Sequence, residues 1–187
     1  MNAGVVQLRS AHADDALAIV AIYAEHVLHG TATFEIEPPD VTEMTSRMQS
    51  IADIGQPWIV ATRDGRVVGY AYAGPYRLRP AYRFTTEDSI YLAPHALRQG
   101  IGRRLLDALI VACERRGDRQ MIAVIGDSSN AASVSVHAAA GFTHVGVLRA
   151  AGRKFERWID VVLMQRALGE GARTPPPGIG AHAEASR

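Results

Sequence analysis

The chain has 187 residues, of which 48% are hydrophobic and 21% charged, and its formal net charge at pH 7 is +1. This length and composition suit one domain with a proper core, and the single cysteine excludes an internal disulfide bond. The near-zero charge provides no bulk basic surface for nucleic acid or an anionic membrane, no apolar run approaches the roughly 20 residues of a membrane span, and the polar start is not a signal peptide. The seven histidines lack paired metal-ligand spacing. We therefore expect a soluble cytoplasmic protein that binds no nucleic acid, membrane or metal.

Hydrophobic periodicity and turn residues predict helices and antiparallel strands in the first half of the chain. Asp14 opens the first helix and Asp40 opens the second. The Asp64-Gly65 pair is a strong signal for a β-hairpin between the next two strands. The predicted elements are a strand at 5–9, helices at 14–28 and 40–54, and strands at 58–62 and 67–73.

The second half alternates strands with helices before two closing strands. The predicted elements are a strand at 85–92, a helix at 102–116, a strand at 121–125, a helix at 130–140, and strands at 143–149 and 156–165. Hairpins early in the chain and βα units late in it imply an α/β protein with an α+β mixed sheet flanked by helices. We expect one domain over residues 1–168 and a flexible tail over 169–187, which is rich in Pro, Gly and Ala.

The most informative local feature is the turn between the strand at 85–92 and the helix at 102–116. Gly100 and Gly102 let the backbone approach an anion without interference from a Cβ atom, and the unpaired amides of the following helix point toward that anion. Arg98 and Arg103 add positive charge at the rim. A glycine pair before a helix is often only a strand-to-helix turn. Because the glycine spacings of dinucleotide and nucleotide-triphosphate loops are absent, a phosphate site here requires a different pyrophosphate carrier.

Together with other motifs, this turn resembles the R/Q-x-x-G-x-G/A signature of the GNAT N-acetyltransferases, and more closely their phosphinothricin and methionine-sulfoximine acetyltransferase branch. The resemblance covers residues 5–166. It implies the GNAT acyl-CoA N-acyltransferase fold, acetyl-CoA as co-substrate, and a homodimer, with which the apolar closing strand agrees. The motifs that carry it are Thr31-Ala-Thr-Phe-Glu35 with Pro38-Pro39, Tyr70-Ala-Tyr-Ala-Gly-Pro75, Thr85-Thr-Glu-Asp-Ser-Ile-Tyr-Leu92, Ala123-Val-Ile-Gly126, Asn130, His137, Gly141-Phe142 and Leu148-Arg-Ala-Ala-Gly-Arg-Lys154.

The resemblance implies an acetyl-CoA site along the strand at 85–92 and the glycine turn. In the family two strands splay apart at this point, and the amides of the pantetheine arm complete the interrupted ladder. The expected backbone contacts to pantetheine come from Ile90, Tyr91 and Leu92. The expected pyrophosphate site comprises Arg98, Gln99, Gly100, Ile101, Gly102 and Arg103.

The helix at 130–140 adds three further cofactor-side residues by resemblance, namely Asn130, Ser133 and His137. Asn130 is equally explained as a helix N-cap. His137 is a buried, satisfied histidine, a contact to CoA, or a donor to the thiolate or oxyanion. The tyrosine that often protonates the leaving thiolate in the family is absent, because residues 137–141 read His-Ala-Ala-Ala-Gly. That role is vacant, or it falls to His137 or water.

Glu87 is the candidate general base, because it matches the family's catalytic glutamate in a T-x-E segment. Strand alternation places Glu87 on the face opposite Asp88. Desolvation beside a mostly apolar pocket would raise the pKa of the Glu87 carboxyl toward the range needed to accept an ammonium proton. The alternative is a solvated acid at a strand end. Asp88 is the second candidate for the base, and it could equally pair with a neighbouring arginine.

The segment at 76–87 is the candidate acceptor site, because its aromatic and arginine side chains suit a small anionic amino acid. Arginines in a loop between strands are more often simply solvated. By resemblance, the acceptor-binding residues are Phe34, Arg77, Leu78, Arg79, Thr85, Thr86 and Glu87. The Arg77-Leu78-Arg79 segment departs from both common patterns of the branch. We expect N-acetylation of an amino acid such as L-phosphinothricin or L-methionine sulfoximine or sulfone, without a secured preference for phosphinothricin.

Other functions stay open from the sequence alone. The acceptor could be another small amine or a protein N-terminus, and a fold with a cofactor site could also serve as a non-catalytic acyl-CoA-binding module. Cys113 lies beside the apolar face of the helix at 102–116 and has no evident electropositive partner, so we interpret it as an inert packed thiol.

Overall fold

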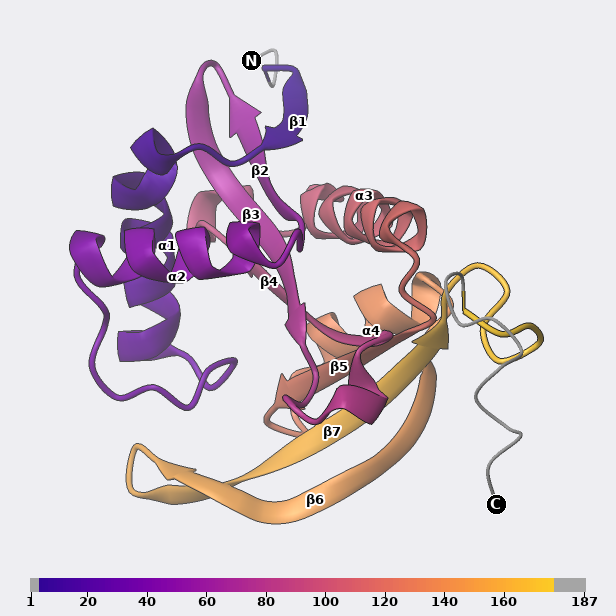
Figure 1. Ribbon diagram of the computed structural model, residues 1–187. Helices are drawn as coiled ribbons and strands as arrows, with labels where there is room; N and C mark the ends of the chain where they lie inside the picture. The colour runs from indigo at the N-terminus through magenta and orange to yellow at the C-terminus, as the bar shows by residue number, and fades with distance from the viewer. Residues whose placement is uncertain (1–3, 177–187) are drawn as a thin grey trace.

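The structure is a computed structural model and describes residues 4–176, in which seven strands form one sheet with helices on both faces (Figure 1). The strands are β1 (Val6–Ser10), β2 (Trp58–Arg63), β3 (Arg66–Pro75), β4 (Thr85–Leu92), β5 (Gln120–Gly126), β6 (Thr143–Lys154) and β7 (Arg157–Ala167). The α-helices are α1 (Ala16–His29), α2 (Val41–Asp53), α3 (Ile101–Arg116) and α4 (Ala131–Ala139). Three short 3-10 turns are η1 (Ala13–Asp15), η2 (Pro80–Tyr82) and η3 (Pro94–Ala96).

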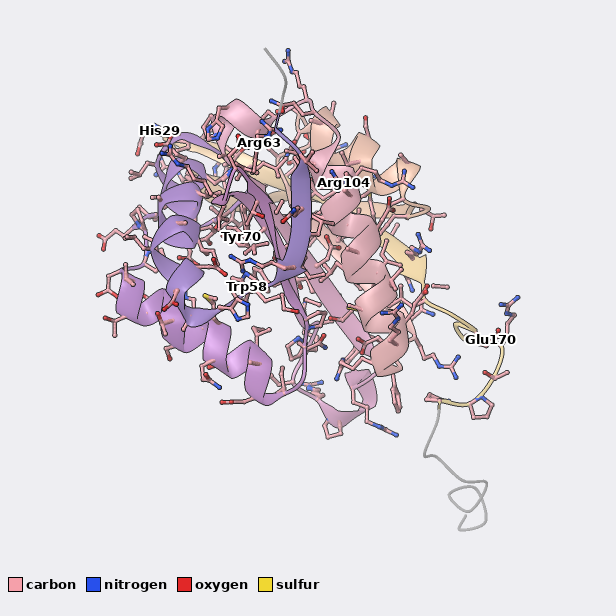
Figure 2. The ribbon with its side chains drawn as sticks, turned by 90° about the horizontal axis from the view of Figure 1, so that it is seen from above. His29, Trp58, Arg63, Tyr70, Arg104 and Glu170 are labelled. Atoms are coloured by element: carbon pink, nitrogen blue, oxygen red, sulfur yellow. The ribbon has the colours of Figure 1, made fainter. Side chains whose placement is uncertain are left out.

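The strand order is β1-β2-β3-β4-β5-β7-β6, and among these strands of residues 4–176 only the central β4–β5 pair is parallel. Helices α1 and α2 cover one face of the sheet, and α3 and α4 cover the other (Figure 1). The same layers are visible from above, with Trp58 and Tyr70 in the interior between α1–α2 and the strands (Figure 2). The sequence-based expectation of a mixed sheet flanked by helices is therefore confirmed.

Local signals explain several of these elements. The Asp64-Gly65 turn between β2 and β3 has positive φ angles of 49° and 76°, as the tight hairpin predicted from the sequence requires. Asp40 caps α2 by accepting a hydrogen bond from the amide of Glu43 at 2.7 Å. Helix α3 buries one stripe, formed by Leu105, Leu106, Leu109, Ile110 and Cys113. Burial raises the pKa of the Cys113 thiol, which fits the packed and inert role expected for it.

Most predicted boundaries were wrong by one or two residues, and the end of β6 was wrong by five. The first helix begins at Ala16 rather than at residue 14, because residues 13–15 form a 3-10 turn in which Asp15 accepts hydrogen bonds from Arg9 and the His12 amide. Strand β6 continues to Lys154 rather than 149, because an irregularity between Leu148 and Gly152 restores its pairing with β7. Strand β7 itself ends at Ala167 rather than 165.

The tail expected at 169–187 is described only as far as residue 176, and residues 177–187 lie outside the described part. In the described part, Arg119 donates a hydrogen bond to the Pro175 carbonyl at 3.0 Å. The domain boundary at 168 stays a prediction. No helix within residues 4–176 is long and apolar enough to cross a membrane, and those residues contain no group of three or more His, Cys, Asp or Glu suited to a metal ion.

Candidate active site

The sheet opens between β4 and β5. Their parallel pairing covers four residue pairs, from Thr85 with Gln120 to Asp88 with Ala123, and then stops. Beyond that point β4 stays paired with β3, while β5 stays paired with β7. Residues 89–92, including Ile90 and Tyr91, therefore present backbone to a gap in the ladder, where a ligand with amide groups can supply the missing partners. One acceptor in this stretch is already used, since the Leu92 carbonyl lies 2.9 Å from His26 Nε2.

The glycine turn stands beside this opening. Gly100 is the N-cap of α3 in the left-handed conformation (φ 75°), and a Cβ atom at this position would have no heavy atom within 4 Å. A Cβ atom at Gly102 would approach Leu92 Cδ1 to 3.4 Å, which shows how closely α3 packs against the end of β4. No side chain caps the helix, so the amides of its first turn are left free to bind an anion. The local structure fits a pyrophosphate.

The polar side chains of the turn mainly bind one another. Gln99 accepts from Arg63 and donates to the His95 carbonyl at 2.8 Å, so it braces the turn. Arg103 donates through Nε to both oxygens of Asp107, at 2.7 and 2.8 Å. Arg98 is exposed and has a φ of 59°, whereas Ile101 is buried in the core. The cofactor contacts of these residues stay predictions.

Glu87 lies on β4 just before the opening. It pairs in register with Gly74 of β3 and Ile122 of β5. Because paired residues point to the same face, the absent side chain of Gly74 leaves space beside the carboxylate, and a Cβ atom there would lie 3.5 Å from Ile51 of α2. The pKa of the Glu87 carboxyl is raised, first by burial and further by repulsion from Asp88, while attraction to Arg77 opposes the rise. A half-buried carboxyl with a raised pKa is suited to accept a proton.

Asp88 points to the opposite face and is bonded to a histidine rather than an arginine. Its Oδ2 lies 2.9 Å from His137 Nε2, and the side chains are 1% and 5% exposed. His137 Nδ1 lies 2.7 Å from the Ser133 carbonyl, so both ring nitrogens are bonded inside the protein. Burial lowers the pKa of His137, but the bond and attraction to Asp88, with the Ser133 carbonyl, outweigh it and raise that pKa overall. This pair joins α4 to β4 where the ladder ends.

Asn130 acts as the N-cap of α4, because its side-chain oxygen accepts a hydrogen bond from the Ser133 amide at 3.2 Å. Asn130 is therefore a helix N-cap, and His137 is a buried histidine whose ring nitrogens are both hydrogen-bonded, as the structural alternatives for these two residues had it. Neither observation tests the proposed contacts of Asn130, Ser133 and His137 with the cofactor, which stay predictions.

A cavity of about 410 Å³ lies beneath α2 on the Glu87 face of the sheet. Its wall includes Trp58, Tyr70 and Tyr72, whose rings stack, with the centroids of Trp58 and Tyr72 4.2 Å apart. Arg47 of α2 also lines it and donates to Glu35 Oε1 and Oε2 at 2.7 and 3.2 Å and to Glu43. None of these side chains was among the site residues predicted from the sequence. The i,i+4 spacing of Glu43 and Arg47 could have signalled their ion pair, but no pattern signalled the cavity.

The loop before α2 is fixed by contacts from distant elements. Thr33 binds the Tyr23 hydroxyl of α1 at 2.7 Å, and its carbonyl accepts a hydrogen bond from the buried ammonium of Lys154 at 2.9 Å. Phe34 lies over β6, because a Cβ atom at Gly152 would meet its ring at 2.6 Å. The ring is not part of the wall of the 410 Å³ cavity. The role of Phe34 in acceptor binding stays a prediction.

The segment expected to bind the acceptor is largely exposed. The Arg77 guanidinium lies 4.3 Å from the centroid of Tyr76, Leu78 is 93% exposed, and Arg79 precedes η2 at the surface. Thr85 is half-buried and pairs with Gln120, and the buried Thr86 hydroxyl donates to the Gly74 carbonyl at 2.7 Å. Of this set, Arg77 acts on Glu87 through its charge. Their substrate contacts stay predictions.

Comparison with known proteins decides the family. Residues 8–163 match the family described as acetyltransferase (GNAT) domain. The chain belongs to the GNAT acetyltransferases. It is 58% identical to a phosphinothricin N-acetyltransferase of Alcaligenes faecalis, over 87% of this chain and 83% of that protein. It is 36% identical to an L-methionine sulfoximine/L-methionine sulfone acetyltransferase of Salmonella typhimurium, over 88% and 96%.

A solved GNAT structure agrees in detail. The phosphinothricin acetyltransferase of Sinorhizobium meliloti, solved in complex with acetyl-CoA, superposes with a TM-score of 0.90 at 46% identity and covers 95% of this chain and 96% of that one. The resemblance to the phosphinothricin acetyltransferase branch is thereby confirmed, as is the GNAT fold. Acetyl-CoA is the ligand held by this solved relative.

Proposed function

We propose that this GNAT protein transfers the acetyl group of acetyl-CoA to the amine of a small amino acid such as L-phosphinothricin or L-methionine sulfoximine or sulfone, with Glu87 as general base. The observation that carries the proposal is the combination, within residues 87–102, of a half-buried carboxylate, a β4–β5 ladder that opens just after it, and a glycine-headed helix terminus without a side-chain cap. The relatives named above acetylate these amino acids, which supports the acceptor class. A cytoplasmic location and a homodimer are further proposals.

The chemistry requires one bond to form, one to break and one proton to move. Acetyl-CoA supplies the thioester, whose C–S bond breaks as the acceptor nitrogen forms a C–N bond with the acetyl carbon. Glu87 accepts the proton that the amine must lose, directly or through water. The leaving thiolate also takes up a proton. Both ring nitrogens of His137 are bonded inside the protein, which favours water as that donor.

A thiol-release assay with acetyl-CoA and the three amino acids tests this function. Glu87→Gln keeps the size of the side chain but cannot accept a proton, so kcat should fall about 100-fold or more while acetyl-CoA affinity stays near normal. The native rate should fall as the pH drops through the raised pKa of Glu87, and the difference between native and variant should shrink at high pH, where free amine is abundant.

Glu25→Gln, an exposed acid on α1, is the matched control and should retain native turnover. Native-like turnover by Glu87→Gln, with chemistry shown to limit the rate, would exclude Glu87 as the base.

A protein N-terminus is a second candidate acceptor. The observation that favours it is a TM-score of 0.85, at 37% identity, to a structure named ribosomal-protein-alanine N-acetyltransferase from Brucella melitensis. Peptides with N-terminal alanine in the same assay separate the two acceptors. Absence of thiol release with every amine would instead favour a non-catalytic acyl-CoA-binding module.

A further inference from the structure

A second cavity lies on the other flank of α2. Its volume is about 280 Å³, and it is bounded by α2, the segment between β1 and η1, and the start of β2. The helix separates it from the 410 Å³ cavity, because the α2 residues that line the two cavities belong to different faces of the helix. Within the described chain, Trp58 is the one residue that lines both. The residues of α2 on the second cavity are Thr45, Met48, Gln49 and Ala52.

Two buried polar atoms of residues that line this second cavity have no partner. Gln56 Oε1 and Trp58 Nε1 are shielded from solvent, and neither atom has a hydrogen-bond partner in residues 4–176. The two residues are 7% and 9% exposed and lie two positions apart at the entry to β2. An unpaired buried donor or acceptor is costly, and most such groups in folded proteins are bonded. One acceptor and one donor at the same cavity therefore call for a partner that carries both functions.

The rest of the wall indicates an uncharged partner. Met48 and Pro57 add apolar surface beside Trp58, and no carboxylate, lysine or arginine of the described residues lines the cavity. His12 is exposed and is the one ionisable side chain among the lining residues. A charged molecule would lose hydration here without an opposite charge among the buried groups.

The size of the cavity indicates a small organic molecule rather than one water molecule. The volume of about 280 Å³ is far above the roughly 30 Å³ that a water molecule occupies in the liquid. It lies just under the range of roughly 300–1,000 Å³ that is typical of small-molecule sites. Thr45 and Gln49 already donate hydrogen bonds, to the Val41 carbonyl at 2.7 Å and to Asp53 at 2.6 Å. The polar contacts of an occupant would therefore come first from Gln56 and Trp58.

A primary carboxamide matches this pair of atoms. It carries N–H donors and a carbonyl acceptor on neighbouring atoms, so it can donate to Gln56 Oε1 and accept from Trp58 Nε1. The flexible Gln56 side chain allows the covered Oε1 to turn toward such a group. We propose that the 280 Å³ cavity is a second binding site of this protein, and that it takes a small uncharged molecule with a primary carboxamide group. The proposal does not depend on the acetyl-transfer function proposed above.

Calorimetric titration of the full chain with isobutyramide tests the site. The native protein should bind this probe saturably, with a Kd of about 1 mM or lower. Two related probes should bind about tenfold or more weakly, because N,N-dimethylisobutyramide lacks the N–H donors and isobutyrate carries a charge. Fluorescence gives a second readout in the Trp158→Phe variant, whose remaining tryptophan is Trp58. Isobutyramide should change this fluorescence over the same range of concentration.

Gln56→Met keeps a flexible side chain of similar length and removes the acceptor. Isobutyramide affinity should fall about tenfold or more, whereas Tm should stay close to the native value, because the acceptor that is lost has no partner in the unliganded protein. Gln7→Met is the matched control, because Gln7 is exposed on β1 and does not line the cavity, and it should leave the affinity unchanged. If Gln56→Met does not fold, the three probes on the native protein decide alone.

Three results would overturn the assignment. The first is the absence of any saturable signal from the native protein up to about 10 mM isobutyramide, which would show that the cavity holds water alone. The second is equal binding of the amide, the dimethylamide and the carboxylate. The third is native affinity for isobutyramide in a folded Gln56→Met variant. None of these results bears on acetyl transfer, which the thiol-release assay tests separately.

Discussion

The buried Asp88–His137 pair provides a direct test of the structure at the point where the sheet opens. Asp88→Asn keeps the shape of the side chain and removes its negative charge. Both partners are nearly inaccessible to solvent, at 1% and 5% exposure, so water cannot replace the lost interaction. A hydrogen bond to a charged group contributes about 1.5–3 kcal/mol, and we expect a loss of about 2 kcal/mol in the free energy of unfolding. For a protein of this size that corresponds to a fall in Tm of about 4–8 °C.

The pH dependence of the free energy of unfolding shows whether His137 is protonated in the pair. The pKa of His137 is raised in the folded state, so its protonated form stabilises the fold. This contribution is fully present below the unfolded pKa of about 6.5 and is lost as the pH rises through the raised folded pKa. In Asp88→Asn the attraction that raises the pKa is gone. The free energy of unfolding of the variant should therefore vary less with pH above about 6.5 than that of the native protein.

Urea unfolding followed by fluorescence, at a series of pH values on both sides of about 6.5, measures both quantities. Glu156→Gln is the matched control, since its ion pair with Arg153 is exposed and worth about 0–1 kcal/mol. Equal pH slopes for Asp88→Asn and the native protein would show that the imidazolium–carboxylate pair does not form.

Two further predictions concern the cofactor turn and assembly. Gly100→Val should weaken acetyl-CoA binding, measured by calorimetry, about tenfold or more. Gly65→Val is the control, because Gly65 is also a left-handed glycine with open space around it, so the substitution should cost a similar backbone strain and leave acetyl-CoA binding intact. Equal acetyl-CoA affinities of the two variants would show that the turn is not part of the cofactor site. Light scattering at micromolar concentration should give the mass of two chains, because β7 and the adjoining turn expose Trp158 and Phe155, and a monomeric mass would refute the homodimer.

Local chemistry explains which parts of the fold could be predicted from the sequence. The Asp64-Gly65 hairpin, the Asp40 cap and the glycine-headed α3 each depend on residues within a few positions of one another. The end of β6 did not follow from its sequence, because Arg149 to Arg153 lack strand periodicity and are held in the sheet by β7.

Residues of the candidate site could be predicted only where they belong to a motif of neighbouring residues. Glu87 and the glycine turn lie in one continuous segment, whereas Asp88 and His137 are 49 positions apart and Lys154 and Thr33 are 121 apart. No periodicity specifies such pairs, because they arise when separate elements pack. Arg47 was missed for the same reason, because its hydrogen bonds to Glu35 join α2 to a loop residue 12 positions earlier.

Strand β4 shows why register matters for both halves of the site. Glu87 and Asp88 are neighbours in sequence but face opposite sides of the sheet, one toward the cavity and the other toward α4. A slip of one residue would place Asp88 at the cavity and bury Glu87 beside His137, exchanging the two carboxylates. The hydrogen bond from the buried Thr86 hydroxyl to the Gly74 carbonyl, together with the Asp88–His137 pair one residue later, opposes that slip from within the strand. The Asp88–His137 pair therefore also determines which of the two carboxylates faces the α2 side of the sheet.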